Sequence, residues 1–234
     1  MPIVFRGILL DAASGMPVIG NANGDQLGVR PADVTTYLNN GVPWVAPTNA
    51  GAPQGASVAP GNGCNLPRHR RPSNTTWNGT NNKAALRVWQ VNTALFPVNE
   101  LAYAADPHNP AHGFISPAGM MPLADFQGYV QSTANLWTVV APPVPACANM
   151  AGAGVDGEER AALIDATASG GDVESLVAEL RAANAAGTSR SDLIAELTSG
   201  VERAADDDAA EVLRDVLDRV TGFCGPHARI DLEE

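Results

Sequence analysis

The sequence predicts an α+β protein, in which a sheet-rich N-terminal domain precedes a C-terminal all-α helical bundle. Charge divides sharply at residue 150. Residues 1–150 carry six acidic and seven basic side chains, a net charge of +1, whereas residues 151–234 carry 19 acidic and seven basic ones, a net charge of −12. The first part also holds 17 of the 18 prolines and 11 of the 12 aromatic residues. Such different compositions indicate two separately built domains.

Strand patterns dominate the N-terminal part. Residues 2–10 form a mostly apolar run, and residues 86–92 (LRVWQVN) alternate between apolar and polar side chains. Residues 100–104 and 113–116 are weaker strand candidates. These segments predict a sheet built from short strands.

Two short helices and one long loop complete the N-terminal part. Residues 31–38 begin with a proline at a first-turn position, and residues 122–137 place apolar side chains at helical spacing. Residues 41–82 are so rich in Gly, Pro and Asn that we expect irregular structure there. Trp44 and Trp77 indicate that this loop packs against the domain.

The C-terminal part has three amphipathic stripes, around residues 173–180, 193–201 and 212–220, with apolar side chains close to i, i+3, i+4, i+7 spacing. Candidate N-terminal caps precede the stripes: Asp172, Ser189 or Ser191, and Asp206. Glycines mark candidate helix boundaries: Gly170, Gly187 and Gly225. With an earlier segment at Leu163 and Ile164, we expect a bundle of about four helices.

These patterns place an N-terminal domain at residues 1–140, a Pro- and Gly-rich linker at 141–154 and an acidic helical domain at 155–234. No window approaches 18 consecutive apolar residues, which excludes a transmembrane helix and a membrane partner. The N-terminal segment lacks the cleavage site of a secretory signal peptide, so we expect a cytoplasmic protein.

The chain has three cysteines: Cys64, Cys147 and Cys224. Their odd number and wide spacing match neither a disulfide framework nor a zinc site. We therefore expect the protein to fold in a reducing compartment.

The segment Arg68, His69, Arg70 and Arg71 is a compact cationic cluster in an otherwise neutral domain. Arginine is well shaped for bidentate contact with phosphate, so the cluster suggests a phosphate-bearing ligand. The alternative is that these arginines pair with the acidic helical domain or lie in solvent. Nucleic acid is not expected, because the net charge is −11 and four residues make no basic stripe.

Other site motifs are weak. His108 and His112, preceded by Asp106, are metal-ligand types, but the intervening prolines prevent a helix that would bring them together, and we expect a turn without metal. Neither a glycine-rich phosphate loop nor a G-x-S-x-G nucleophile elbow is present.

Four stretches of the N-terminal domain stand out in order: VFRG (4–7), GASVAP (55–60), NLPRHRRP (65–72) and HGFISPAGMMPLADFQGYVQSTANLW (112–137). The last is the most specific, a His-led strand that ends in Pro and leads through Met-Pro into an amphipathic helix. Across roughly residues 1–140, they resemble a family of bacterial toxins, the ADP-ribosyltransferase-like effectors of the second exported type VI secretion class. The resemblance implies an ADP-ribosyltransferase-like α+β fold, NAD as the dinucleotide ligand, and toxicity inside a target cell. It also implies an immunity or antitoxin partner and export by a route that needs no signal peptide.

The resemblance also implies roles for individual residues. Arg6 corresponds to the first-strand arginine that holds the dinucleotide, and Ser57 to the small hydroxyl residue that orders the pocket, with Ala56 where a threonine is expected. The implied cofactor-binding residues are Arg6, His69, Arg70, Arg71 and His112. Each has a structural alternative: a strand arginine at a rim, an ordinary loop serine, or a histidine that bonds the backbone.

One departure from the family concerns catalysis. Such transferases use a late glutamate to stabilise the positive charge that develops on the nicotinamide ribose. Glu100 is the one glutamate of residues 1–150, and it lies outside the expected paired pattern, so it is the catalytic candidate beside Arg6 and Ser57, with Asp106 behind it. The leading prediction is an NAD-dependent ADP-ribosyltransferase or NAD glycohydrolase. The alternative is a noncatalytic nucleotide-binding or assembly module whose helical domain mediates contacts with a partner.

The charge asymmetry predicts a contact between the two domains. The acidic helical domain can dock over residues 68–71 and restrain the site until a partner or salt displaces it. The alternative is that the acidic helices face water, where an exposed ion pair contributes only about 0 to 1 kcal/mol.

Overall fold

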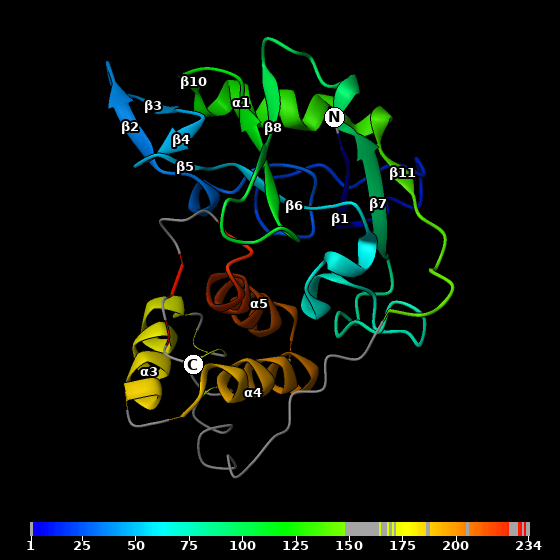
Figure 1. Cartoon of the computed structure of the whole chain (residues 1–234), viewed down its shortest axis with the longest axis vertical. Coiled ribbons are helices and arrows are strands. Elements are labelled where there is room, and N and C mark those ends of the chain that lie inside the picture. The colour runs from blue at the N-terminus through cyan, green and yellow to red at the C-terminus, as the bar shows by residue number, and fades with distance from the viewer. Residues whose placement is uncertain are drawn as a thin grey trace.

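The protein is described by a computed structural model, which covers residues 2–147, 172–185, 188–204, 206–224, 229–230 and 232, and positions 164, 168 and 170. The architecture is mixed α+β, as the sequence predicts. Figure 1 shows the sheet-rich N-terminal part beside a group of C-terminal helices. Several predicted features lie outside the described residues: positions 148–154 of the linker, Leu163, Gly187 and Gly225.

The main sheet is antiparallel throughout. Its six strands lie in the order β11 (Thr138–Val139), β7 (Leu86–Asn92), β1 (Ile3–Leu9), β6 (Ala56–Pro60), β9 (Gly113–Pro117) and β8 (Leu101–Ala105). The four strands expected from sequence patterns are therefore all present, as β1, β7, β8 and β9.

The main sheet opens between β1 and β6, which pair over only part of their length. β1 pairs with β7 along its whole length, but its ladder with β6 consists of Val4↔Pro60 and Phe5↔Ala59. From Arg6 onward, β1 and β6 separate. Continuing that register would place Gly7 opposite Ser57, so both residues border the opening.

The segment expected to form an irregular loop contains regular structure, which corrects that prediction. It includes β3 (Val42–Val45), β4 (Thr48–Asn49), β5 (Ala52–Pro53) and β6, and the 3-10 turns η2 (Gly63–Asn65) and η3 (Arg68–Arg70). β3 lies between β10 (Met121–Pro122) and β2 (Thr36–Asn39) in a small second sheet, and β4 pairs with β5.

The predicted helix at 31–38 is wrong. One 3-10 turn, η1 (Pro31–Asp33), ends at Val34, and β2 follows it. The run Val34-Thr35-Thr36 is β-branched and favours extended backbone. Asn40 and Gly41 then adopt positive φ of 52° and 79° in the turn to β3, a conformation that Asn-Gly favours in two-residue hairpins.

The second predicted N-terminal helix is present but shorter. α1 (Leu123–Ser132) is followed by the 3-10 turn η5 (Ala134–Leu136); another turn, η4 (Thr93–Leu95), follows β7. Phe126 and Val130 of α1 are fully buried and pack in one core with Val4, Ile8 and Trp89 of the main sheet. A smaller cluster includes Phe5, Ala59, Val88, Trp77 and Phe223.

The C-terminal part forms α3 (Val173–Ala185), α4 (Arg190–Arg203) and α5 (Asp207–Thr221). The predicted caps are confirmed: Asp172 accepts backbone N–H groups of Glu174 and Ser175, and Ser189 and Asp206 cap the other two helices. α5 ends at Gly222, whose φ is 73°. The three helices share a core of their own with Ile164 and Ala168. α5 is the helix that faces the sheet-rich part (Figure 1). No helix within the described ranges combines the length and apolar character needed to cross a membrane.

The expectation that the cysteines form no disulfide is wrong. Cys64 of η2 and Cys147 are bonded across a sequence separation of 83 residues, and Cys224 is free and buried. This bond removes the sequence argument for a reducing compartment. It also joins Cys147, which lies in the predicted linker, to the N-terminal domain, where the backbone N–H of Cys147 donates to Thr76 O at 2.9 Å.

Candidate functional site: a buried arginine cluster

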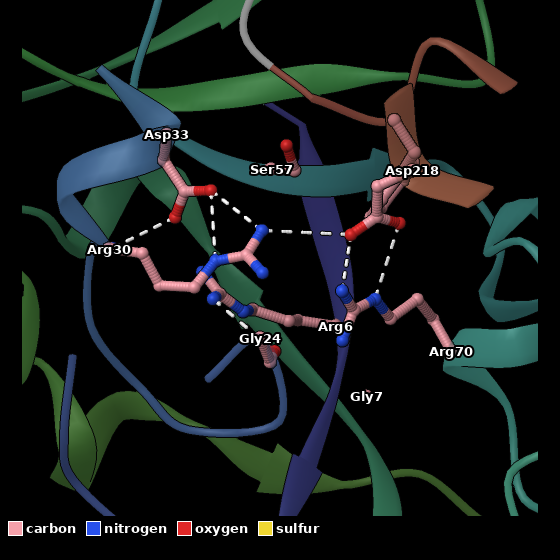
Figure 2. A pocket seen from close by; sticks show the side chains of 9 residues that line it. Arg6, Gly7, Gly24, Arg30, Asp33, Ser57, Arg70 and Asp218 are labelled. Carbon is pink, nitrogen blue, oxygen red and sulfur yellow. Dashed lines mark hydrogen bonds and ion pairs between the residues drawn. The ribbon is translucent and has the colours of Figure 1, made fainter. Parts of the chain in front are cut away.

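Three arginines from separate elements converge where β1 and β6 separate. They are Arg6 of β1, Arg30 immediately before η1, and Arg70 of η3, and we call them the arginine cluster. They line one cavity together with Gly7, Gly24, Asp33, Ser57, Asp218 and Phe223 (Figure 2). Arg6 is 5% exposed and Arg70 is 3% exposed, so the charges lie inside the protein. Burial of charge on this scale requires bound counter-charges.

Two glycines allow Arg70 to approach. A Cβ atom on Gly7 would lie 2.1 Å from the carbonyl oxygen of Arg70, and one on Gly24 would lie 2.3 Å from its guanidinium. Either side chain would displace Arg70. The position of Gly7 therefore requires glycine, because the neighbouring atom belongs to the backbone of η3, whereas a side chain at Gly24 would push the Arg70 guanidinium out of its position.

Arg30 is held by the turn that follows it. Its Nε and Nη2 donate to Asp33 Oδ1 at 3.1 and 2.8 Å, and its backbone N–H donates to Asp33 Oδ2 at 2.9 Å. This fork-like contact fixes the guanidinium with its remaining donors directed into the cavity (Figure 2).

Two polar groups at the cavity lack a hydrogen bond among the described residues. Arg6 Nη2 donates to Gly24 O at 3.5 Å, but its Nη1 and the hydroxyl of Ser57 have no partner there. Burial, reinforced by the charges of Arg30 and Arg70, lowers the pKa of Arg6 to about 10. An anionic ligand would satisfy both groups and relieve this repulsion.

Asp218 of α5 lies between Arg30 and Arg70 (Figure 2). Arg70 Nη2 donates to Asp218 Oδ2 and Arg70 Nε to Oδ1 at 3.3 Å, while His69 Nε2 lies 2.7 Å from Oδ1. Arg30 Nη2 lies 3.7 Å from Oδ2. Only about 10 Å³ remains free in the cavity, about the space of one water molecule, so the carboxylate fills the position between the arginines.

Two further carboxylates of α5 reach the same site. Asp215 contacts Arg30 Nη1, and Glu211 accepts the backbone N–H of Gly24 at 3.0 Å and lies 3.9 Å from Arg70. The predicted docking of the acidic helices on the basic segment is confirmed as a contact. The receiving surface differs from the predicted one, because Arg30 and Lys83 join His69 and Arg70 in contacting α5.

The acidic and basic groups of the site shift one another's pKa values toward the ionised forms. Burial opposes ionisation, but the charge of Arg70 and the hydrogen bond from His69 hold the pKa of Asp218 well below its ordinary value of 3.8. Burial likewise opposes the charge of Arg70, yet Asp218, Glu211 and Asp25 raise its pKa well above the usual value. Asp25 is fully buried and also bonds Lys83 and Asn81.

A histidine–aspartate pair lies next to the cluster. His112 Nδ1 is 2.7 Å from Asp106 Oδ2, and both side chains are almost fully buried. Among the described residues, His112 Nε2 has no hydrogen-bond partner. The ring of Phe223, which lines the arginine cavity, lies 4.7 Å from the His112 ring, and Arg229 donates to Asp106. The geometry fits an imidazole oriented by a carboxylate.

The structure brings some of the predicted site residues together and leaves others apart. Arg6, Ser57 and Arg70 line the cavity, His69 contacts Asp218 there, and His112 is adjacent through Phe223. Arg71 is buried but does not line the cavity, and burial lowers its pKa to about 10.

Glu100, the catalytic candidate, does not line the cavity. It immediately precedes β8, whereas Asp106 immediately follows it, and the rise of an extended strand places these two residues about 20 Å apart. The N-terminal carboxylate that does line the cavity is Asp33. Within the described ranges, no three His, Cys, Asp or Glu side chains are arranged to hold a metal ion.

Sequence reasoning missed Arg30, Asp33 and Asp218. One signal was available for α5: Glu211, Asp215 and Asp218 recur at i, i+4, i+7 spacing, which places three carboxylates on one helix face. No local signal marks Arg30, because its role depends on the approach of α5, 185 residues later in the chain.

Comparison of this chain with known proteins finds no matching family model and no significant match to a curated protein or a solved structure. The residues of the site and the sequence resemblance are therefore the two observations that bear on function.

The buried ionisable groups predict loss of stability in acid. Burial lowers the pKa of His69 and of His112 from 6.5. Burial raises the pKa of Asp106, but the hydrogen bonds from His112 and from the backbone N–H of His108 outweigh it and lower that pKa to about 2. In each case the unfolded chain takes up its proton at a higher pH than the folded chain does. The free energy of unfolding should therefore fall as the pH drops below about 6.5, through the histidines, and again below about 4, through Asp106 and Asp218.

Urea unfolding between pH 7 and pH 3 measures this dependence. Asp218, which faces His69, Arg70 and Arg30, should account for part of the second decline, so Asp218→Asn should flatten it. Asp208→Asn, an exposed change in the same helix, should leave the profile unchanged. Stability that is constant from pH 7 to pH 3 would contradict the ionised state of the cluster.

Proposed function

We propose that the N-terminal domain binds NAD at the arginine cluster and consumes it, as an ADP-ribosyltransferase or an NAD glycohydrolase. The observation that carries the proposal is the convergence of Arg6, Arg30 and Arg70 on one buried cavity beside the hydroxyl of Ser57. The ionised oxygens of a diphosphate can accept paired hydrogen bonds from several arginine guanidinium groups. The position between Arg30 and Arg70 already holds one anionic group, the carboxylate of Asp218.

The resemblance in sequence supports the choice of NAD among phosphate-bearing ligands. Arg6 and Ser57, which it singles out, lie 51 positions apart in the sequence and both line the cavity. In the proposed reaction the bond from the ribose to nicotinamide breaks, and nicotinamide leaves with the bonding electrons. Water or an acceptor then attacks the ribose carbon and loses a proton.

Two side chains are the candidates to assist this reaction. Asp33 is the N-terminal carboxylate at the cavity, so it replaces Glu100 as the group that stabilises positive charge on the ribose. His112, oriented by Asp106, is the candidate acceptor for the proton of the attacking nucleophile. Action inside a target cell and neutralisation by an immunity protein are further parts of the proposal, which the resemblance alone supports.

A noncatalytic nucleotide-binding or assembly module is the second candidate. The position of Glu100 away from the cavity favours it, because the glutamate that such transferases use is then missing from the site. The two candidates differ in one product, free nicotinamide.

Release of nicotinamide from NAD by the purified chain tests the proposal. We expect Arg6→Ala and Ser57→Ala each to lower the rate roughly 10- to 100-fold, because each removes a group aimed at the ligand or its charge. The matched controls are Arg87→Ala, whose side chain donates to nearby backbone carbonyls, and Ser132→Ala on the exposed end of α1. Both should retain the parent rate. Binding of ADP-ribose without any nicotinamide release would favour the noncatalytic module. If the chain neither binds ADP-ribose nor releases nicotinamide, both candidates are rejected.

A further inference from the structure

We propose that α5 and the residues that follow it form an internal plug of the ligand site, in which Asp218 occupies the position of a ligand phosphate. The plug is defined as residues 207–224. This inference rests on the proposed function, because it concerns regulation of the same site. It states that docking of the plug and binding of a phosphate-bearing ligand exclude one another.

The charge balance of the N-terminal domain supports competition. Four of its cations surround the site, Arg6, Arg30, Arg70 and Lys83, but the domain supplies only two carboxylates among them, Asp25 and Asp33. The plug adds three carboxylates, Glu211, Asp215 and Asp218, and one buried cation, Arg214, which pairs with Glu211. Their net charge of −2 neutralises the two remaining positive charges. A buried cluster with excess positive charge must bind anions from some source. The plug therefore supplies what a diphosphate would supply.

The plug also covers the second half of the site. Phe223 lines the arginine cavity and lies against the ring of His112. Beyond the plug, Arg229 bonds Asp106, the partner of His112. The plug and Arg229 thus cover the arginine cluster and the histidine–aspartate pair together. A ligand that bridges the two would have to displace both.

The architecture allows release of the plug without unfolding it. The apolar face of α5, including Leu213, Val216 and Leu217, belongs to the core of the helical bundle. The carboxylates lie on the face that meets the sheet-rich domain. Separation of the two parts would therefore expose the charged face and the ring of Phe223, while the bundle core stays closed.

The test uses the full chain, ADP-ribose as the probe, and two measurements: the affinity for ADP-ribose by calorimetry and the hydrogen exchange of α5. Asp218→Asn removes the central carboxylate charge. Asp215→Asn is a milder variant at a half-buried position that contacts Arg30, and it guards against misfolding of the first. Asp208→Asn is the control, since it removes the same charge from the exposed first turn of α5.

We expect Asp218→Asn to tighten ADP-ribose binding roughly 5- to 150-fold, the range of typical coupling between two binding events, and Asp215→Asn to have a smaller effect of the same sign. Saturating ADP-ribose should speed the exchange of α5 in the parent, because the ligand releases the plug. Asp208→Asn should match the parent in both measurements.

The outcomes separate this inference from the proposed function. Equal affinity for ADP-ribose in the parent and both site variants, with no ligand effect on α5 exchange, would overturn the plug and leave the ligand site standing. A different result would overturn both the plug and the proposed function: no variant binds ADP-ribose, although hydrogen exchange of α5 rises in Asp218→Asn. It would show that release of the plug uncovers no ligand site.

Discussion

Substitution of Arg70 by alanine should lower the free energy of unfolding by about 3 to 5 kcal/mol. Arg70 is bonded to Asp218 and Asp25, both of which are buried, so its loss leaves two carboxylates inside the protein without their main cation. Denaturant unfolding at pH 7 measures the change.

Two comparisons make the result specific. Arg219→Ala removes an ion pair with Glu174, a residue whose side chain is 78% exposed, and should cost no more than about 1 kcal/mol. In the double variant Arg70→Ala/Asp218→Ala, the cost should be clearly smaller than the sum of the single changes, because the unpaired carboxylate is gone. Additive costs would show that Arg70 and Asp218 do not depend on one another.

Replacement of both Cys64 and Cys147 by serine should lower the free energy of unfolding by about 2 to 5 kcal/mol. The disulfide joins residues 83 positions apart, so without it the unfolded chain gains the freedom of a long loop. A reductant supplies the control. It should reduce the stability of the parent to that of the double variant and leave the double variant unchanged. A parent that is insensitive to reductant would mean that the bond contributes nothing measurable.

Local patterns predict β1, β7, β8, β9, α1 and the three C-terminal helices, but not β2 to β6, β10 or β11. The alternation of residues 86–92 predicts β7 with its observed bounds, and the apolar run near the N-terminus predicts β1. Side-chain period is a property of a few consecutive residues, so the sequence contains it directly. The three C-terminal helices follow for the same reason, and their caps are local as well.

Features that depend on long-range contacts could not be obtained in this way. Pro31 correctly marks a turn, but the backbone N–H of Thr35 donates to the side chain of Gln54, 19 residues away, and the chain continues as a strand. The disulfide was missed because an odd cysteine count hides which pair is close in space. Asp218 was missed for a similar reason, since it lies 148 residues from Arg70.

The candidate site was predicted in part. Arg6 and Ser57 were found through the resemblance of their segments to a known family, and the cationic segment located His69 and Arg70. Arg71 was included because it is adjacent in sequence, yet its side chain packs elsewhere. Residues 68–70 form the 3-10 turn η3, in which successive side chains point in different directions, so the run of basic residues does not converge as a unit. Arg30 and Asp33 show the opposite situation. The local turn positions the Arg30 guanidinium, but its role in the site becomes visible only through its contact with α5.

Because the ribosome makes the chain from its N-terminus, the arginine cluster is synthesised before the plug that covers it. Arg70, the last arginine of the cluster, precedes Asp218 by 148 positions. At ordinary rates of synthesis, the three arginines therefore exist for roughly 7 to 30 s before Asp218 is made. During that interval Asp33 can pair with Arg30 and Asp25 with Arg70, but only anions from the surroundings can take the place of Asp218 between the two arginines. A nascent chain, or one whose synthesis stops before α5, thus presents an uncovered cationic site that the finished protein does not.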